Sequence, residues 1–147
     1  MKDYNLANLI GNPTDRSLAF AKLIFGRVLE RYPGLKFLLA HAGGFLPYTW
    51  GRLDRGYHVQ DSAKLKLSKA RSEYMKRLYF DTITHSPMAL EYPVHRFGAD
   101  HVLLGSDYPY DMGDPEPLGS LRATGIDNEQ IAQIAANNAC KLLRIGI

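Results

Sequence analysis

The fold of this chain is decided by the stretch Val102-Leu103-Leu104-Gly105-Ser106-Asp107-Tyr108-Pro109. Its apolar first half is typical of a buried strand, and Pro109 prevents that strand from continuing inside a sheet. Asp107 therefore follows the carboxyl end of a strand, which is where parallel α/β folds place their chemistry. The octet fits equally well an aspartate that caps the next element, and the stretch alone leaves both interpretations open.

The same pattern of a short apolar strand, a polar end and a helix occurs three times. We expect strands at residues 35–40, 78–83 and 101–104, and the unbroken apolar run at 35–40 is typical of a strand buried on both faces. His41 directly follows the first strand, and His85 and Asp107 closely follow the other two. Because parallel strands bring their carboxyl ends to one edge of a sheet, we expect these three side chains to gather there.

Helices are expected between these strands, from the spacing of apolar residues and from start and stop signals. Residues 1–13 are expected to be irregular, because Gly11-Asn12-Pro13 is a strong breaker and Thr14 or Asp15 can cap a helix that follows. The predicted helices cover residues 16–32, about 45–57, 87–97 with Ser86 as N-cap and Gly98 as stop, about 118–123, and a last helix capped by Asp127 with Gln130 three positions later.

Length and composition predict a single soluble domain over residues 1–147. Apolar residues make up 46% and charged residues 22%, and a formal charge of +3 does not require nucleic acid or a membrane as partner. The basic residues of 61–77 are better explained as a solvated helical face than as an anion-binding surface. Cys140 is the only cysteine, which excludes an intrachain disulfide and agrees with a cytoplasmic location. Neither a membrane span nor a signal peptide is expected.

Two of the candidate side chains have competing explanations that the residues alone leave open. His41 precedes two glycines, so it can ligate a metal or shuttle protons with room for a substrate, or it is a structural histidine. Arg52 can clamp a carboxylate with two parallel hydrogen bonds if its helix returns it to the strand ends. Its spacing alone favours a surface ion pair, for example with Asp54. His85 can act at the same edge or simply bond to a neighbouring loop.

Five segments in register carry a resemblance to a known family. They are Leu9–Pro13, Ala40–Pro47, Gly51–Asp54, Asp81–His85 and Leu104–Gly113. In this order they resemble the C-terminal part of the aminocarboxymuconate-semialdehyde decarboxylase group of the amidohydrolase superfamily. The resemblance implies an α/β fold, the C-terminal portion of a (β/α)8 TIM barrel with parallel strands and flanking helices. It also implies a divalent metal, usually zinc, and the non-oxidative decarboxylation or hydrolysis of small unsaturated or aromatic carboxylic acids.

The resemblance also implies roles for individual residues. Asp107 corresponds to the metal-binding aspartate of the last barrel strand. His41 corresponds to the histidine that bonds the metal-bound water and acts as acid and base, so His41 and Asp107 are the catalytic candidates. Arg52 corresponds to an arginine that contacts the substrate carboxylate, and His85 falls at the mouth of the site, where we count it with substrate binding. The position of Ala42 is often glycine in the family.

The chain also departs from the family pattern in what it lacks. The family begins with a strand that carries a His-x-His pair, and a further ligand histidine precedes the Gly-Asn-Pro segment, whereas no histidine precedes His41 here. A catalytic zinc site takes about three protein ligands, and a (β/α)8 barrel typically takes about 250 residues. We therefore expect the metal site to be incomplete in this chain alone. It is then completed by a missing N-terminal half, or stabilised as a homo-oligomer; the alternative is a catalytically silent half-barrel that acts as an assembly or interaction module.

Overall fold

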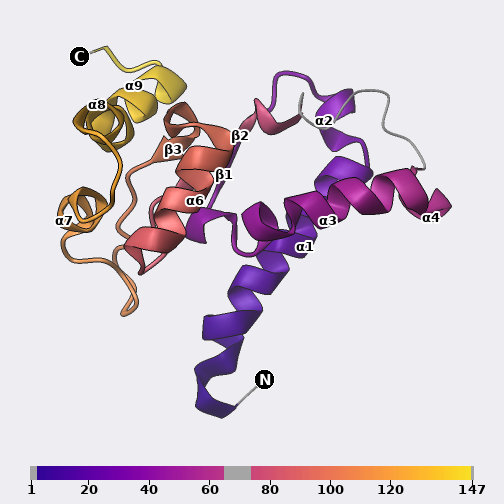
Figure 1. The fold of residues 1–147 in the computed structure, drawn as a ribbon, viewed down its shortest axis with the longest axis horizontal. Coiled ribbons are helices and arrows are strands. Elements are labelled where there is room, and N and C mark those ends of the chain that lie inside the picture. Colours follow the sequence, from indigo (N-terminus) through magenta and orange to yellow (C-terminus); the bar gives the residue numbers. More distant parts are fainter. Residues whose placement is uncertain (1–2, 65–73, 147) are drawn as a thin grey trace. The chain divides into compact units, whose positions relative to one another are not determined.

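The computed structural model describes residues 3–64 and 74–146, which form helices and a small parallel sheet (Figure 1). The strands are β1 (Phe37–Leu39), β2 (Leu78–Asp81) and β3 (Val102–Leu103). The α-helices are α1 (Asn12–Phe25), α2 (Val28–Arg31), α3 (Leu46–Val59), α4 (Asp61–Lys64), α6 (Pro87–Phe97), α7 (Pro117–Arg122), α8 (Asn128–Ala132) and α9 (Asn138–Leu143). Five short 3-10 or π-helical segments are Asp3–Asn5, Ala7–Gly11, His41–Gly43, Ala99–His101 and Gln133–Asn137. Most of the basic run predicted at 61–77, including Lys66, Lys69 and Arg71, lies outside the described residues.

The chain divides into two compact units. The first comprises Met1–Phe37 and Gly43–Leu78, and the second comprises Leu38–Ala42 and Tyr79–Ile147. The strands β1 and β2 each continue from the first unit into the second. Within the described residues, no helix is both long enough and apolar enough to cross a bilayer.

The three predicted parallel strands are confirmed, although each is shorter than expected. The sheet has the order β1-β2-β3, and β2 pairs with β3 in parallel, with Phe80 opposite Val102 and Asp81 opposite Leu103. The expectation that residues 35–40 form a strand buried on both faces is wrong, because Leu38 in the middle of β1 is 54% exposed. As an edge strand of the described sheet, β1 has a neighbouring strand on one side only.

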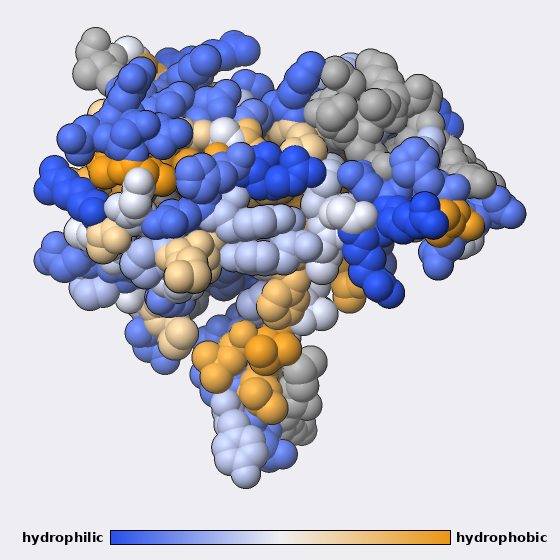
Figure 2. Space-filling view, viewed as in Figure 1, coloured by the Kyte–Doolittle hydropathy of each residue, from blue (hydrophilic) through white to orange (hydrophobic). Residues whose placement is uncertain are grey.

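The N-terminal segment is helical from Ala7 onward, so the prediction of an irregular stretch at residues 1–13 is wrong for residues 7–13, while residues 1–2 lie outside the described residues. A π-helical turn at Ala7–Gly11 runs directly into α1, and both Gly11 and Asn12 have right-handed helical backbone. Pro13 lies in the first turn of α1, where a missing N–H costs nothing, so it does not break the helix. The Thr14 hydroxyl donates back to the Ile10 carbonyl instead of capping. In Figure 2 an apolar patch lies on this N-terminal segment, where Leu9 and Ile10 are both almost half exposed.

The predicted helix over residues 16–32 is interrupted. It ends at Phe25, because Gly26 and the left-handed Arg27 (φ 61°) turn the chain before the short helix α2 begins. Glu30 in α2 then accepts a bond from the Arg27 Nε at 2.5 Å. The stretch of helically spaced apolar residues at 16–32 therefore spans two helices, α1 and α2.

The helix boundaries in the second unit follow the predicted signals. Ser86 caps α6 by accepting from the Ala89 N–H, and Gly98 ends that helix with φ 98°. Asp127 caps α8 by accepting from the Gln130 N–H at 2.8 Å. These caps are local, and they fix where the chain enters and leaves each helix.

A packed core supports β3 and the segment that follows it. Its buried members are Leu90, Val94, Ala99, Val102, Leu121, Ile126 and Ile134. The buried Asn138 side chain donates to the Ala99 and Val102 carbonyls, which satisfies backbone groups next to β3. The segment that carries Asp107 therefore begins at a strand that is held in place by this core and by the Asn138 hydrogen bonds.

Candidate functional site

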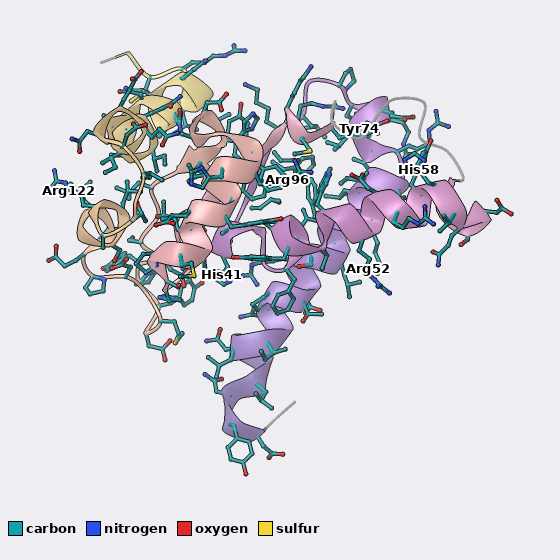
Figure 3. All side chains as sticks on the ribbon, viewed as in Figure 1. His41, Arg52, His58, Tyr74, Arg96 and Arg122 are labelled. Carbon is teal, nitrogen blue, oxygen red and sulfur yellow. The ribbon has the colours of Figure 1, made fainter. Side chains whose placement is uncertain are left out.

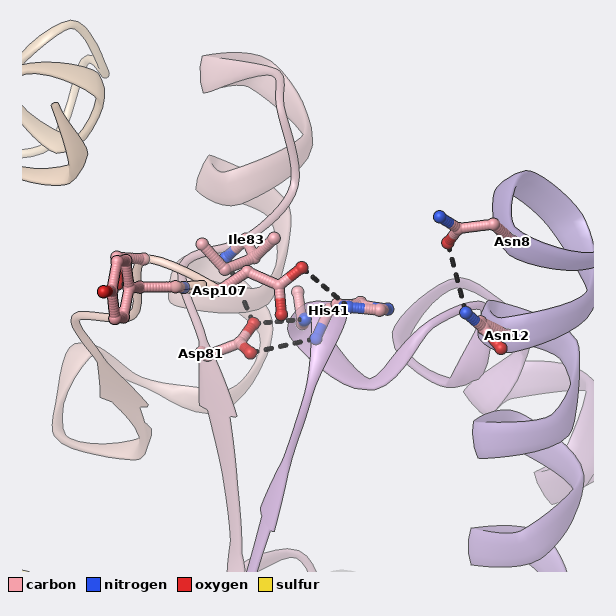
Figure 4. Close-up of polar contacts among 9 residues, drawn as sticks. Asn8, Asn12, His41, Asp81, Ile83 and Asp107 are labelled. Carbon is pink, nitrogen blue, oxygen red and sulfur yellow. Dashed lines mark hydrogen bonds and ion pairs between the residues drawn. The ribbon is translucent and has the colours of Figure 1, made fainter. Parts of the chain in front are cut away.

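His41 and Asp107 come together at the carboxyl ends of β1 and β3 (Figure 4). The His41 Nε2 lies 3.6 Å from the Asp107 Oδ2, and the two side chains are only 19% and 22% exposed. They are separated by 66 positions in the sequence, so only the parallel arrangement of strands brings them together. A partly buried imidazole beside a carboxylate can hold a proton on the nitrogen that faces the carboxylate.

The backbone at the strand ends adopts a conformation that L-residues avoid. His41, His85 and Asp107 have φ values of 55°, 55° and 57°. Ala42 has φ 48°, and Gly43 and Gly44 continue the left-handed turn with φ 78° and 64°. A non-glycine residue in this region costs roughly 1–2 kcal/mol. Such residues cluster at functional sites, where the surrounding structure holds them in place.

Asp81, the last residue of β2, supplies part of that support, and the sequence analysis did not single it out. Its Oδ2 accepts from the His41 N–H at 3.0 Å, and its Oδ1 accepts from Ala42 at 2.8 Å and from Ile83 at 3.1 Å (Figure 4). Burial raises the pKa of the Asp81 carboxyl above its ordinary value of 3.8, against the lowering effect of these hydrogen bonds and of His41. The available signal was a carboxylate that ends an otherwise apolar strand, the same signal that marked Asp107.

A second contact joins the ends of β2 and β3. The Thr82 hydroxyl donates to the Gly105 carbonyl at 3.2 Å and accepts from the Gly105 N–H at 3.1 Å. Gly105 also passes close to Asp81, since a Cβ atom at position 105 would lie 3.1 Å from the Asp81 Cβ. The small residue lets the segment that leads to Asp107 approach the end of β2.

The other two predicted site residues are not part of this contact network. Arg52 belongs to α3 in the first unit, where it is exposed (Figure 3). It lines a cavity of about 350 Å³ together with Phe25, Leu53, Arg55, Gly56, Val59 and Gln60. His85 belongs to the second unit and follows β2, and its side chain is exposed. The structure thus brings together two of the four predicted side chains.

The side chains at the strand ends are of the types that bind a divalent metal, but there are too few of them among the described residues to form a metal site. Carboxylate oxygen and imidazole nitrogen are both zinc ligands, but a catalytic zinc centre takes about three protein ligands. Across residues 3–64 and 74–146, no group of three or more His, Cys, Asp or Glu side chains is arranged to hold a metal ion. The described residues do not make a metal centre by themselves.

Comparison with known proteins agrees with the family resemblance of the sequence along nearly the whole chain. The sequence pattern of the family described as amidohydrolase matches residues 7–145. The chain is 35% identical over 118 residues to 2-amino-3-carboxymuconate-6-semialdehyde decarboxylase of Dictyostelium discoideum, an overlap of 80% of this chain and 33% of that protein. It is 33% identical over 98 residues to 6-methylsalicylic acid decarboxylase of Penicillium expansum, covering 66% of this chain and 30% of that protein. The chain spans about a third of the length of these curated relatives.

Solved structures match as well. The chain superposes on 5-carboxyvanillate decarboxylase of Sphingomonas paucimobilis with a TM-score of 0.86 and 28% identity, over 99% of this chain and 44% of that one. Dihydroxybenzoic acid decarboxylase of Polaromonas sp. shares the fold, with a TM-score of 0.79 and 22% identity over 90% of this chain and 41% of that one. The latter protein was solved with bound manganese and an inhibitor.

Proposed function

The chain belongs to the amidohydrolase family, in its group of aminocarboxymuconate-semialdehyde decarboxylases, and we propose that it contributes the C-terminal part of a TIM-barrel decarboxylase site. The proposed reaction is the metal-dependent, non-oxidative decarboxylation, or alternatively the hydrolysis, of a small unsaturated or aromatic carboxylic acid. Two relatives from different organisms are decarboxylases of such acids by name, which supports this substrate class.

The observation that carries the proposal is the contact between the His41 Nε2 and the Asp107 Oδ2 at 3.6 Å. Loss of carbon dioxide leaves an electron pair on the substrate carbon, and a proton must be delivered to that carbon. Imidazole is the side chain best suited to take and return a proton near neutral pH. Asp107 beside it can orient the ring and stabilise the protonated imidazole until the proton is delivered.

The remaining roles follow from the family resemblance. Asp107 is the proposed metal ligand of this chain, and zinc is the proposed metal, although manganese is the ion seen in a relative of the same fold. Other ligands would have to come from outside the described residues, so no step of the reaction is assigned to the metal. Arg52 is proposed to bind the substrate carboxylate, and His85 to line the entrance. Homo-oligomerisation, or a separate N-terminal half, and a cytoplasmic location stay predictions.

The proposed metal site can be tested by adding manganese to the isotope-labelled 147-residue chain. Mn²⁺ is paramagnetic, so it broadens NMR signals close to where it binds, even when it binds weakly through an incomplete set of ligands. We expect selective broadening of the His41 and Asp107 signals, reversed by excess zinc because both ions compete for the same donors. In Asp107→Asn, which keeps the size of the side chain, we expect this broadening to fall by at least about tenfold, because even the loss of a group that only orients a ligand typically costs about 10- to 100-fold in metal affinity.

Asp111→Asn is the matched control, because Asp111 is an exposed carboxylate of the same loop. It should leave the broadening at His41 unchanged. Broadening that persists in Asp107→Asn, or that centres elsewhere in the chain, would contradict the proposed site. A chain that binds neither ion and forms a tight oligomer would favour the assembly module instead.

A further inference from the structure

The carboxylate of Asp81 holds together the ends of two strands, and the proposed reaction gives it no part. Its two oxygens accept from three backbone N–H groups, which belong to residues two or three positions after the end of β1 and two positions after the end of β2. We propose that Asp81 is the positioning residue of the site: it fixes the turn after β1 in the conformation in which the His41 imidazole meets Asp107. This inference rests on the proposed function only in assigning proton transfer to His41.

The first argument is the backbone of the turn that Asp81 holds. Residues 41–44 all have positive φ, which glycine adopts without cost. Only His41 and Ala42 among these four carry a side chain, and they are the two whose N–H groups Asp81 accepts. Hydrogen bonds to a carboxylate are roughly twice as strong as those between neutral groups. The Asp81 carboxylate therefore binds the two residues of the turn for which left-handed backbone is least favourable.

The second argument is what the turn does for His41. The direction in which a side chain leaves the backbone is set by φ and ψ, so relaxation of the turn would rotate the imidazole away from its present direction. The His41 Nε2 lies 3.6 Å from the Asp107 Oδ2, which leaves little margin for such a rotation. Gly105, in the segment leading to Asp107, passes close to the Asp81 side chain, since a Cβ atom at position 105 would lie 3.1 Å from the Asp81 Cβ. The Asp81 side chain is thus close both to the turn that carries His41 and to the segment that leads to Asp107.

The two oxygens of Asp81 have different partners, and this makes a sharp test possible. Oδ1 accepts from Ala42 and Ile83, and Oδ2 accepts from His41. In Asp81→Asn, one oxygen becomes an NH₂ group. The amide oxygen should take the Oδ1 place, because that place satisfies two donors, and its NH₂ group then faces the His41 N–H, donor against donor.

The experiment is amide hydrogen exchange on the labelled full chain, read as the ratio of the His41 rate to the Ala42 rate. A ratio cancels any loss of global stability, which accelerates both amides alike. We expect the ratio to rise about tenfold in Asp81→Asn, the equivalent of one lost hydrogen bond of ordinary net strength. Thr82→Val is the matched control. It has nearly the same shape and removes the neighbouring contact to Gly105, so it should leave the ratio unchanged.

A second readout tests the consequence for the imidazole. In the otherwise unchanged chain, Asp107→Asn should shift the His41 ring signals, because the two side chains are in contact. In the Asp81→Asn background the same substitution should shift them by less than half as much. Such a loss of response identifies positioning, since a purely structural contact would leave the His41–Asp107 coupling intact.

If Asp81→Asn does not fold, Gly105→Ala gives the same test with every hydrogen-bonding group retained. Its methyl group would press on the Asp81 Cβ at 3.1 Å, and we expect a weakened His41 response to Asp107→Asn. An unchanged exchange ratio, or an unchanged His41 response, would overturn the inference. The manganese experiment reports on Asp107 as a ligand and not on the turn, so failure of the proposed function and failure of this inference are distinguishable.

Discussion

Each end of β2 carries one charged side chain that satisfies three backbone groups. Arg77, directly before the strand in the first unit, donates from Nη1 to the carbonyls of Leu29, Tyr32 and Pro33. Asp81, at the end of the strand in the second unit, accepts from three N–H groups. The same type of interaction thus occurs at both ends of β2. A guanidinium group donates to backbone carbonyls at one end, and a carboxylate accepts from backbone N–H groups at the other.

The two interactions differ in the segment of backbone that each one stabilises. Arg77 closes the turn after α2, where Tyr74 is buried and its hydroxyl bonds to Glu30. No candidate site residue belongs to that turn. Asp81 holds a left-handed turn that carries His41. In parallel barrels the amino ends of the strands contribute stability and the carboxyl ends contribute chemistry. The comparison predicts that the Arg77 end can be weakened without effect on the site, while the Asp81 end cannot.

The largest expected effect on stability comes from Arg77→Met, which keeps the length of the side chain and removes its donors. We expect the free energy of unfolding to fall by about 2 kcal/mol, because a hydrogen bond from a charged donor contributes about that much. Urea unfolding measures this loss. Arg122→Met is the control, since Arg122 is exposed on α7 and its replacement should change stability by less than about 0.5 kcal/mol.

The same Arg77→Met chain also tests the contrast between the two ends of β2. Its ratio of His41 to Ala42 amide exchange should match that of the unsubstituted chain, because Arg77 does not touch the turn at residues 41–44. A changed ratio would mean that the amino end of β2 also sets the geometry of the site, and the comparison would fail.

A smaller effect is expected from Ala42→Gly. Glycine adopts φ 48° freely, which relieves roughly 1–2 kcal/mol of strain. The loss of a buried methyl group costs about 0.8 kcal/mol and the extra backbone entropy that glycine loses on folding costs roughly 0.5–1 kcal/mol, so these terms nearly cancel and we expect stability to change by less than about 0.5 kcal/mol. Ala99→Gly is the matched control: Ala99 is equally buried, but its φ is not positive, and we expect a loss of about 1.5 kcal/mol. Equal losses at both positions would show that the turn is not strained.

Local signals in the sequence predicted much of this fold. Ser86, Gly98 and Asp127 act through residues a few positions away, and their caps are confirmed. The meeting of His41 and Asp107 followed from the order of strands alone. The prediction from Gly11-Asn12-Pro13 was wrong, because a proline in the first turn of a helix is compatible with that helix.

Asp81 shows why the rest of the site could not be predicted in this way. Two of its three hydrogen bonds come from residues 40 and 39 positions earlier, so no local pattern reveals them. The left-handed backbone at His41, His85 and Asp107 is likewise a property of the packed strand ends and not of these residue types. Arg52 illustrates the opposite case: the family resemblance implies a role for it, but it is exposed on α3 and takes no part in the contacts described at the strand ends.

The smallest expected effect is a pH dependence that separates the two ends of β2. Burial raises the pKa of the Asp81 carboxyl, so the folded chain binds that proton more tightly than the unfolded chain. The resulting stability is fully present below the ordinary pKa of 3.8 and is lost as the pH rises through the folded pKa. Urea unfolding over a pH series should therefore show the stability difference between the unsubstituted chain and Asp81→Asn falling across this window and constant above it. Arg77 does not titrate, so the difference for Arg77→Met should stay flat. A difference that instead rises with pH would mean that the three amide bonds outweigh burial, and that Asp81 holds the turn more strongly as a carboxylate than its surroundings oppose the charge.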